Sequence, residues 1–400
     1  MAMTVSPITA LCSKHNLFEA RIGGYHVYRI PGIVVTRRGT VVAYCEARLG
    51  NGGDWDPIDI CMRRSVDDGM TWDEPTIAMD HRQFGSKSPV NNFVCTADQG
   101  TGDVHVLFCN NYARVFAMKS EDDCLSFSQP RDVTHVFEPL RQIYPFRVIA
   151  VGPGHGIQLR NGRLIVPVWM SDGSGTEFGA GKLGHRPSEV ASVFSDDHGE
   201  TWQAGDFVVR NEPRFRNPNE TCAVELSDGR VLFNTRTESV THRRLITTST
   251  DGATNWSAPR FDDELLEPIC MGSIVSLHHG HPVVFANPGV LERTMAGGPG
   301  RHIGPDERGR PFDRKQLTIR LSEDDCQTWS YKRQLEDGPS GYSDLAVLTD
   351  GTMLCLYECG VGNRMYDNRY LRLARFNLDW IMHRQVQELA PKLTIPSDTS

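Results

Sequence analysis

The stretch Ser65-Val-Asp67-Asp-Gly69-Met-Thr71-Trp72 is the first of five copies of one short pattern, and these copies decide the fold class. The other copies begin at Ser120, Ser195, Ser249 and Ser322. In each copy an aspartate follows the serine by two residues and an aromatic residue follows it by seven. The starts are 55, 75, 54 and 73 residues apart, a spacing that suits a repeated unit of several strands better than a helical repeat.

Each copy, called a box below, has the composition of a tight turn. An aspartate beside a glycine accepts hydrogen bonds from backbone N–H groups, and glycine tolerates the left-handed conformation that such turns need. The aromatic residue is placed to pack back against the sheet. We therefore interpret the boxes as structural and expect no catalytic role for their aspartates.

Between the boxes, short apolar runs are separated by turn residues, which is typical of β-hairpins. The clearest predicted hairpins join residues 32–36 to 40–45, 156–159 to 164–169, 223–226 to 231–234, and 346–348 to 353–357. No segment shows a sustained helical period. Regular strands and a repeated turn predict an all-β fold, a β-propeller, and at roughly 60 to 65 residues per blade the chain suffices for six blades. We expect one domain over residues 1–400, with 379–400 as a C-terminal tail.

Composition excludes several classes of protein. The chain has 400 residues with 42 basic and 50 acidic side chains, a net charge of −8, and no basic run suited to nucleic acid. No apolar stretch is long enough to span a membrane, and the N-terminus lacks the features of a secretory signal. The eleven cysteines include no CxxC pair, which favours free thiols. We expect a cytoplasmic protein, or a secreted one whose signal sequence has been removed.

The boxes, together with Tyr28-Arg29-Ile30-Pro31 upstream of the first, resemble the exo-α-sialidases (neuraminidases), which carry Asp-box (BNR) repeats. The resemblance spans nearly the whole chain. It implies a six-bladed propeller whose boxes lie on the face opposite the active site, and a box-less sixth blade that combines the chain ends. It also implies a substrate: terminal α-linked sialic acids on oligosaccharides, glycoproteins or glycolipids.

A sialic acid carries a carboxylate on its anomeric carbon, and a cluster of arginines suits an anion at that place because guanidinium is planar, permanently charged and bidentate. By the resemblance, Arg29, Arg236 and Arg314 are the three arginines of such a cluster. Arg320 is a nearby rival of Arg314 that we interpret as structural. Glu46, at the end of the next predicted strand, is expected to be the partner of Arg29.

The resemblance also implies a tyrosine nucleophile, because a carboxylate nucleophile would be repelled by the carboxylate of the substrate. Tyr342 matches the Tyr-Ser-Asp-Leu segment of the family, and Glu220 matches the base that activates the phenol. Asp54, in a Gly-Gly-Asp-Trp loop, is the expected acid/base, with Asp56 and Asp59 as competitors. To act as an acid, Asp54 needs a pKa raised by burial.

Two further residues, Arg48 and Asn92, resemble the family's contacts to the 4-hydroxyl of the sugar, although the family often has Asp where Asn92 stands. The His-rich residues 278–281 have no carboxylate or cysteine at ligand spacing, so we predict no metal, and the matched mechanism needs no cofactor. The sequence predicts a retaining exo-α-sialidase. A trans-sialidase, an anhydro-forming relative, an enzyme for deaminated sialic acid and a non-catalytic sialic-acid-binding propeller stay as alternatives.

Overall fold

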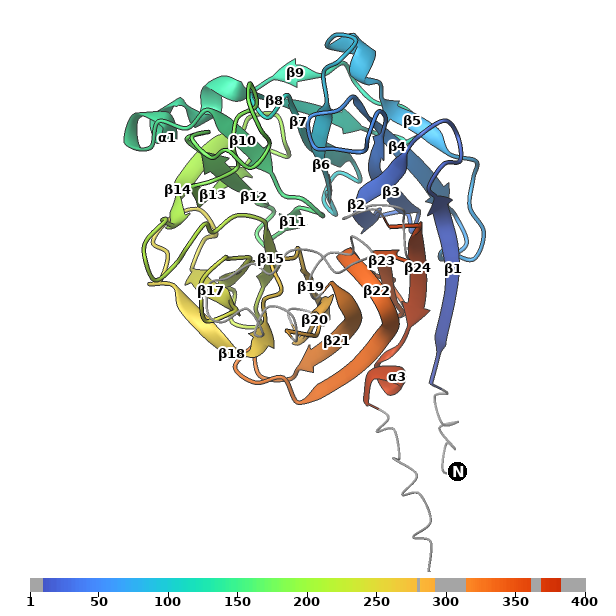
Figure 1. The fold of residues 1–400 in the computed structure, drawn as a ribbon. Coiled ribbons are helices and arrows are strands. Elements are labelled where there is room, and N and C mark those ends of the chain that lie inside the picture. Colours follow the sequence, from blue (N-terminus) through green and yellow to red (C-terminus); the bar gives the residue numbers. More distant parts are fainter. Residues whose placement is uncertain (1–9, 279–280, 292–313, 361–367, 383–400) are drawn as a thin grey trace, which may run out of the picture.

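The computed structural model describes residues 10–278, 281–291, 314–360 and 368–382, and these residues form a β-propeller with short helices only. Figure 1 shows the sheets arranged around a central axis. Three sheets have four strands each. They consist of β2 (Val27–Val35), β3 (Val41–Arg48), β4 (Ile58–Ser65) and β5 (Thr76–Met79); β6 (Val90–Ala97), β7 (Val104–Asn110), β8 (Arg114–Ser120) and β9 (Arg131–Asp132); and β15 (Thr221–Glu225), β16 (Val231–Thr235), β17 (Arg243–Ser249) and β18 (Arg260–Leu266).

A fourth sheet has five strands, because the short β11 pairs with one end of β12 while β10 pairs with the other. Its strands are β10 (Val148–Val151), β11 (Ile157–Gln158), β12 (Leu164–Ser171), β13 (Ser188–Ser195) and β14 (Gln203–Val209). The hairpins predicted from the sequence are confirmed, since β2 pairs with β3, β11 with β12, β15 with β16, and β22 with β23.

The remaining strands form one continuous seven-stranded sheet in the order β1-β24-β23-β22-β21-β20-β19. They are β1 (Cys12–Glu19), β19 (Ser273–His278), β20 (His281–Pro288), β21 (Lys315–Ser322), β22 (Tyr331–Val347), β23 (Met353–Cys359) and β24 (Tyr370–Phe376). The prediction of six separate blades is therefore not met by the hydrogen bonding, because the 17-residue β22 pairs with β21 through its first half and with β23 through its second.

The seven-stranded sheet also joins the two ends of the described chain. Strand β1 pairs antiparallel with β24, and the two lie side by side in Figure 1. The expectation that the chain ends meet in one sheet is thus confirmed. Helix α3 (Leu378–Met382) follows β24 and buries Trp380 and Ile381, so the predicted tail begins with a packed helix; residues 383–400 lie outside the described residues.

The apolar core is divided among the spaces between neighbouring sheets. One cluster, for example, packs Tyr44 and Ile60 of the first sheet against Phe108 and Phe116 of the second. Another packs strands β20 and β21 against β23 and β24, so the seven-stranded sheet folds over on itself. Alternating inward side chains of facing sheets bury apolar area in this way without a single central core.

The remaining helices of the described residues are α1 (Glu138–Ile143) and two 3₁₀ turns, η1 (His81–Gln83) and η2 (Thr134–Phe137). Within the described residues, no helix has the length and hydropathy needed to cross a bilayer.

The boxes form the predicted turns. In the first, Asp67 accepts hydrogen bonds from the backbone N–H of Thr71 at 2.8 Å and from its hydroxyl at 2.6 Å, while the hydroxyl of Ser65 accepts from the N–H of Gly69. Cys124 and Cys326 occupy the glycine position in two other boxes, and both adopt positive φ, 64° and 63°, as Gly69 does at 79°. The turn geometry is therefore kept without glycine.

The boxes and the predicted site residues lie at opposite ends of the same sheets. In the first sheet, Val35, Val41 and Ser65 are aligned at one end, whereas Arg29 and Glu46 are paired near the other. We call these the box end and the site end. This register agrees with the expectation that the boxes are remote from the site.

Candidate active site

A cavity of about 460 Å³ opens at the site end, a volume suited to a small ligand. Its lining contains all the residues that the sequence predicted for substrate contact or catalysis: Arg29, Glu46, Arg48, Asp54, Asn92, Glu220, Arg236, Arg314 and Tyr342. They lie in or next to strands of the first sheet, the second sheet, the β15–β18 sheet and the seven-stranded sheet, and in the loop between β3 and β4. The propeller thus gathers residues from distant parts of the sequence around its axis.

Three buried arginines surround one aromatic ring. The guanidinium carbons of Arg29 and Arg314 lie 5.3 Å and 5.1 Å from the centroid of the Tyr342 ring, and Arg236 donates a hydrogen bond to the Tyr342 hydroxyl at 2.7 Å. Arg314 donates to the backbone oxygen of Ile269 at 2.7 Å. The cluster concentrates positive charge in a cavity and suits an anionic group, above all a carboxylate.

The partner of Arg29 is Glu358 of β23, with Nε of Arg29 3.0 Å from Oε1. The prediction that Glu46 plays this part was wrong. Glu46 and Arg48 are two residues apart on β3, so their side chains point to the same face of the strand. Glu46 therefore pairs with Arg48 instead, and its Oε2 accepts from Nη2 at 2.6 Å and from Nε at 2.9 Å. Glu358 was missed because its 329-residue separation from Arg29 hides the pairing; its one signal in the sequence is an acidic residue within an otherwise uncharged buried strand.

Tyr342 and Glu220 are directly hydrogen-bonded to each other in the cavity. The Tyr342 hydroxyl donates to Oε1 of Glu220 at 2.5 Å, and Arg236 donates to the other carboxylate oxygen. Burial raises the pKa of Tyr342 above its usual value, and this outweighs the opposing effect of Arg236. A phenol in this state needs a base in contact with it to lose its proton at neutral pH, and Glu220 occupies that position.

Asp54 is the one of the three candidate acids that lines the cavity. Asp56 instead accepts hydrogen bonds from backbone N–H groups of its own loop, and Asp59 accepts from Tyr25 and from His81. Asp54 accepts from Arg48 at 2.6 Å. Burial acts to raise the pKa of Asp54, but the surrounding positive groups, of which Arg48 contributes most, together outweigh it. The pKa therefore lies below its ordinary value, whereas the acid role requires a raised one.

Asn92 lies in β6 with φ of 52°, a left-handed conformation that asparagine tolerates better than most residues. Its backbone N–H donates to Oε1 of Glu46 at 3.0 Å. One network of hydrogen bonds along the cavity wall therefore links Asn92, Glu46, Arg48 and Asp54.

An aromatic wall that the sequence did not predict completes the cavity. It consists of Tyr112, Trp169, Phe178 and His185, and the ring of His185 lies 4.5 Å from that of Phe178 and 4.6 Å from that of Tyr112. Trp55 does not line the cavity but packs against Tyr112, with the ring centroids 5.2 Å apart. Burial lowers the pKa of His185 to about 4. Among the described residues, buried ring nitrogens of Trp55, Trp169 and His185 have no hydrogen-bond partner. The wall offers apolar contact together with unused polar groups.

Other candidates lie outside the cavity. Arg320 is buried and donates to Asn287 at 2.8 Å, which fits its interpretation as structural. The residues of the His-rich stretch at 279–280 are outside the described residues. In the part of the chain that the structure describes, Asp59, Asp80 and His81 are the group whose potential metal-ligand atoms lie within 4.8 Å of one another. Asp59 is already engaged by His81 and Tyr25, and the group does not line the cavity.

The structure thus combines a β-propeller with an arginine cluster and a tyrosine–glutamate pair in one cavity, which are the features that the resemblance implied. The BNR repeat-like domain family matches residues 39–355. The chain belongs to the sialidase family that carries BNR repeats.

Two curated relatives show how much of the chain the similarity covers. A sialidase of Micromonospora viridifaciens is 30% identical over 383 residues, which is 90% of this chain but 52% of that protein. Sialidase-3 of Rattus norvegicus is 27% identical over 390 residues, 87% of this chain and 91% of that protein. The chain therefore spans about half the length of the bacterial relative and most of the mammalian one.

Solved structures share the fold. The Hadza microbial sialidase Hz136 matches with a TM-score of 0.74 and 24% identity, over 92% of this chain and 69% of that one. The intramolecular trans-sialidase of Ruminococcus gnavus matches with a TM-score of 0.69 and 17% identity, over 92% of this chain and 98% of that one.

Proposed function

We propose that the chain is a retaining exo-α-sialidase that releases terminal α-linked sialic acids from oligosaccharides, glycoproteins or glycolipids. The observation that carries this proposal is the 2.5 Å hydrogen bond from Tyr342 to Glu220 inside a cluster of three arginines. The arginine cluster suits an anionic sugar, and the tyrosine–glutamate pair suits covalent catalysis beside it.

In the proposed complex, Arg29, Arg236 and Arg314 hold the substrate carboxylate. The carboxylate is attached to the anomeric carbon, so the reacting centre comes next to Tyr342, which these arginines surround. The rings of the aromatic wall suit an apolar part of a sugar substituent.

Tyr342 acts as the nucleophile. Glu220 accepts the phenolic proton as the phenolate oxygen bonds to the anomeric carbon, and the bond to the leaving oxygen breaks. Arg236, which contacts both groups, stabilises the charge that moves from the carboxylate to the phenol oxygen.

Asp54 protonates the leaving oxygen and then takes a proton from the water that releases the sugar. Because the pKa of Asp54 is lowered in the free protein, the acid form is scarce at neutral pH. We expect kcat/KM to rise as the pH falls below neutral, because a larger fraction of Asp54 then carries its proton. The negative charge of the substrate raises the pKa of Asp54 in the complex, since it offsets the nearby arginines.

We also propose that the seven-stranded sheet serves as two blades, which gives the propeller six. The two halves of β22 pair with different neighbours, and the strands on either side pack face to face. These observations support a fold in which β22 passes from one blade into the next.

Proton NMR of 3′-sialyllactose incubated with the protein tests the proposed function. The α-anomer of free sialic acid should appear before the β-anomer, because two inversions at the anomeric carbon retain its configuration. An anhydro product would assign intramolecular transfer to the same residues. Absence of reaction, with this substrate and with its deaminated counterpart, would leave a sialic-acid-binding propeller as the function.

A further inference from the structure

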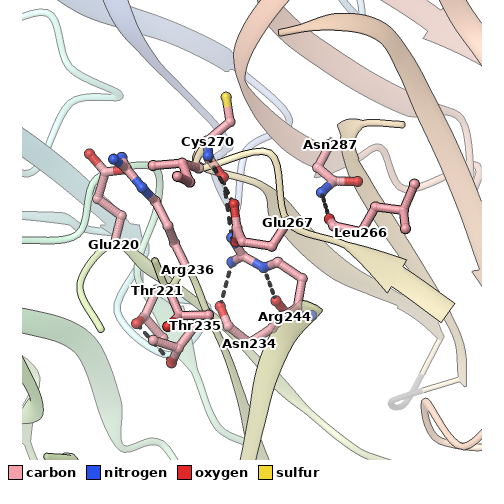
Figure 2. A network of polar contacts seen from close by, with 12 residues as sticks. Glu220, Thr221, Asn234, Thr235, Arg236, Arg244, Leu266, Glu267, Cys270 and Asn287 are labelled. Atoms are coloured by element: carbon pink, nitrogen blue, oxygen red, sulfur yellow. Dashed lines mark hydrogen bonds and ion pairs between the residues drawn. The ribbon is translucent and has the colours of Figure 1, made fainter. Parts of the chain in front are cut away.

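A fully buried ion pair lies beside the arginine cluster and is not part of the cavity lining. Arg244 of β17 donates to Glu267 at 2.6 Å, and neither side chain is exposed to solvent. Figure 2 shows Arg244 between Asn234 and Glu267, with Arg236 and Glu220 on neighbouring backbone. The guanidinium uses its nitrogens on four acceptors, which fixes its position closely.

One side of Arg244 holds the strand that carries Arg236. Its Nε donates to the side-chain oxygen of Asn234 at 2.6 Å, and its Nη2 donates to the backbone oxygen of the same residue at 2.9 Å. Asn234 stands two residues before Arg236 at the end of β16. These two hydrogen bonds therefore fix the end of β16 next to Arg236, which lines the cavity.

The other side of Arg244 holds the segment that binds Arg314. Nη1 of Arg244 donates to Glu267 and to the backbone oxygen of Cys270, and Glu267 in turn accepts from the N–H of Cys270 at 2.9 Å. The turn closed in this way contains Ile269, whose backbone oxygen accepts from Arg314. Ile269 has φ of 60°, a strained conformation for a β-branched residue that persists only when its surroundings hold it.

Stability alone is a weak reason for such a pair. Replacing a buried ion pair with apolar residues of similar volume is often neutral or stabilising, whereas removing one partner leaves a buried charge without compensation. What the charged pair provides here is a fixed geometry for two neighbouring segments, each of which carries or binds an arginine of the cluster.

We propose that Arg244 and Glu267 are positioning residues: they hold Arg236 and Arg314 where both can bind the same carboxylate. This inference rests on the proposed function, since it takes the substrate carboxylate as the common ligand of the cluster. Misplacing either arginine weakens the carboxylate contact and leaves contacts to the rest of the sugar unchanged.

The test measures how much the carboxylate contributes to binding. Calorimetry gives the dissociation constants of an unsaturated sialic acid analogue and of its methyl ester, and their ratio isolates the carboxylate. The main variant is the double substitution Arg244→Met with Glu267→Leu, which removes both charges and keeps an apolar filling; Glu267→Gln is the second variant. Asp98→Asn is the matched control, because Asp98 is a fully buried carboxylate with several hydrogen bonds at the box end.

In both variants of the pair, the ester-to-acid ratio should fall by about tenfold or more, because small displacements of charged groups are costly to binding. The control should keep the wild-type ratio. An unchanged ratio in a folded variant of the pair, or an equal fall in the control, would overturn the inference. A wild-type protein that binds neither analogue, or both equally, would instead overturn the proposed function.

Discussion

At the box end of the sheets each repeated turn satisfies its aspartate within a few residues, whereas at the site end the carboxylates are paired with arginines, in one case from a distant strand. Asp67 receives its hydrogen bonds from Ser65, Met70 and Thr71. Glu358 pairs with Arg29, and Glu220 contacts both Arg236 and Tyr342. The first kind of contact shapes the backbone of one turn, and the second holds charged and catalytic side chains together beside the cavity.

This difference assigns separate tasks to the two ends. Hydrogen bonds within a turn lower the pKa of the box aspartates and leave them ionised and inert. At the site end, three arginines converge on one tyrosine inside a cavity, an arrangement that suits an anionic ligand. Substitutions at the site end should therefore act on ligand binding and turnover, and substitutions at the box end on stability.

The largest effect is expected for Tyr342→Phe. Loss of the hydroxyl removes the nucleophile, and kcat should fall by about 10³-fold or more, which is about 4 kcal/mol. Binding of the unsaturated analogue should stay within a few-fold, because the cluster of arginines is intact. Steady-state kinetics with an aryl sialoside and calorimetry check both halves; a turnover rate near that of the wild type would show that Tyr342 is not the nucleophile.

Arg236→Ala should weaken the binding of substrate and analogue together, by about 100-fold, because this charged contact exists in the ground state and in the transition state alike. KM and the inhibition constant of the analogue are the quantities to compare. A change confined to kcat would mean that Arg236 acts on the nucleophile rather than on the carboxylate.

The contribution of the box end to the stability of the fold should depend on pH. Burial acts to raise the pKa of Asp98, but hydrogen bonds from His198, Gln158 and backbone N–H groups lower it to about 2 from the ordinary 3.8. A lowered pKa stabilises the fold above pH 3.8, and this contribution of about 2 kcal/mol is lost as the pH falls toward 2. Urea unfolding of Asp98→Asn should show a flatter dependence on pH over this range; a slope equal to that of the wild type would refute the assignment.

The smallest effect is expected for Ser65→Ala. It leaves the N–H of Gly69 without the hydroxyl that it contacts at 2.9 Å, and the free energy of unfolding should fall by about 1 kcal/mol. kcat and KM should not change, since Ser65 lies at the opposite end of the sheet from Arg29. A loss of activity larger than the loss of folded protein would contradict the separation of the two ends.

The sequence predicted what is local or repeated. Boxes and hairpins depend on residues close to one another, and they were found in the structure as expected. The motifs around Arg29, Glu220 and Tyr342 predicted residues that the structure gathers in one cavity. The pairing of Arg29 with Glu358 depends on how β23 is placed beside β2, which no short segment encodes.

Two further differences have the same physical origin. The acid role of Asp54 was expected to need a pKa raised by burial, but the neighbouring arginines, above all Arg48, lower this pKa in the structure. The division into six blades was predicted from spacing, but the unbroken β22 depends on how two consecutive halves of one strand meet different partners. Both depend on distances between groups rather than on residue type.

The pairing of β1 with β24 has a consequence for the synthesis of the chain. During translation β1 is made long before its partner, and its hydrogen-bonding edge stays unpaired until nearly all other strands have been made. The order of synthesis therefore leaves closure of the ring to the end, and the growing chain carries an open strand edge that favours association with other chains. Ribosome-bound intermediates that lack β24 should be the species most dependent on chaperones.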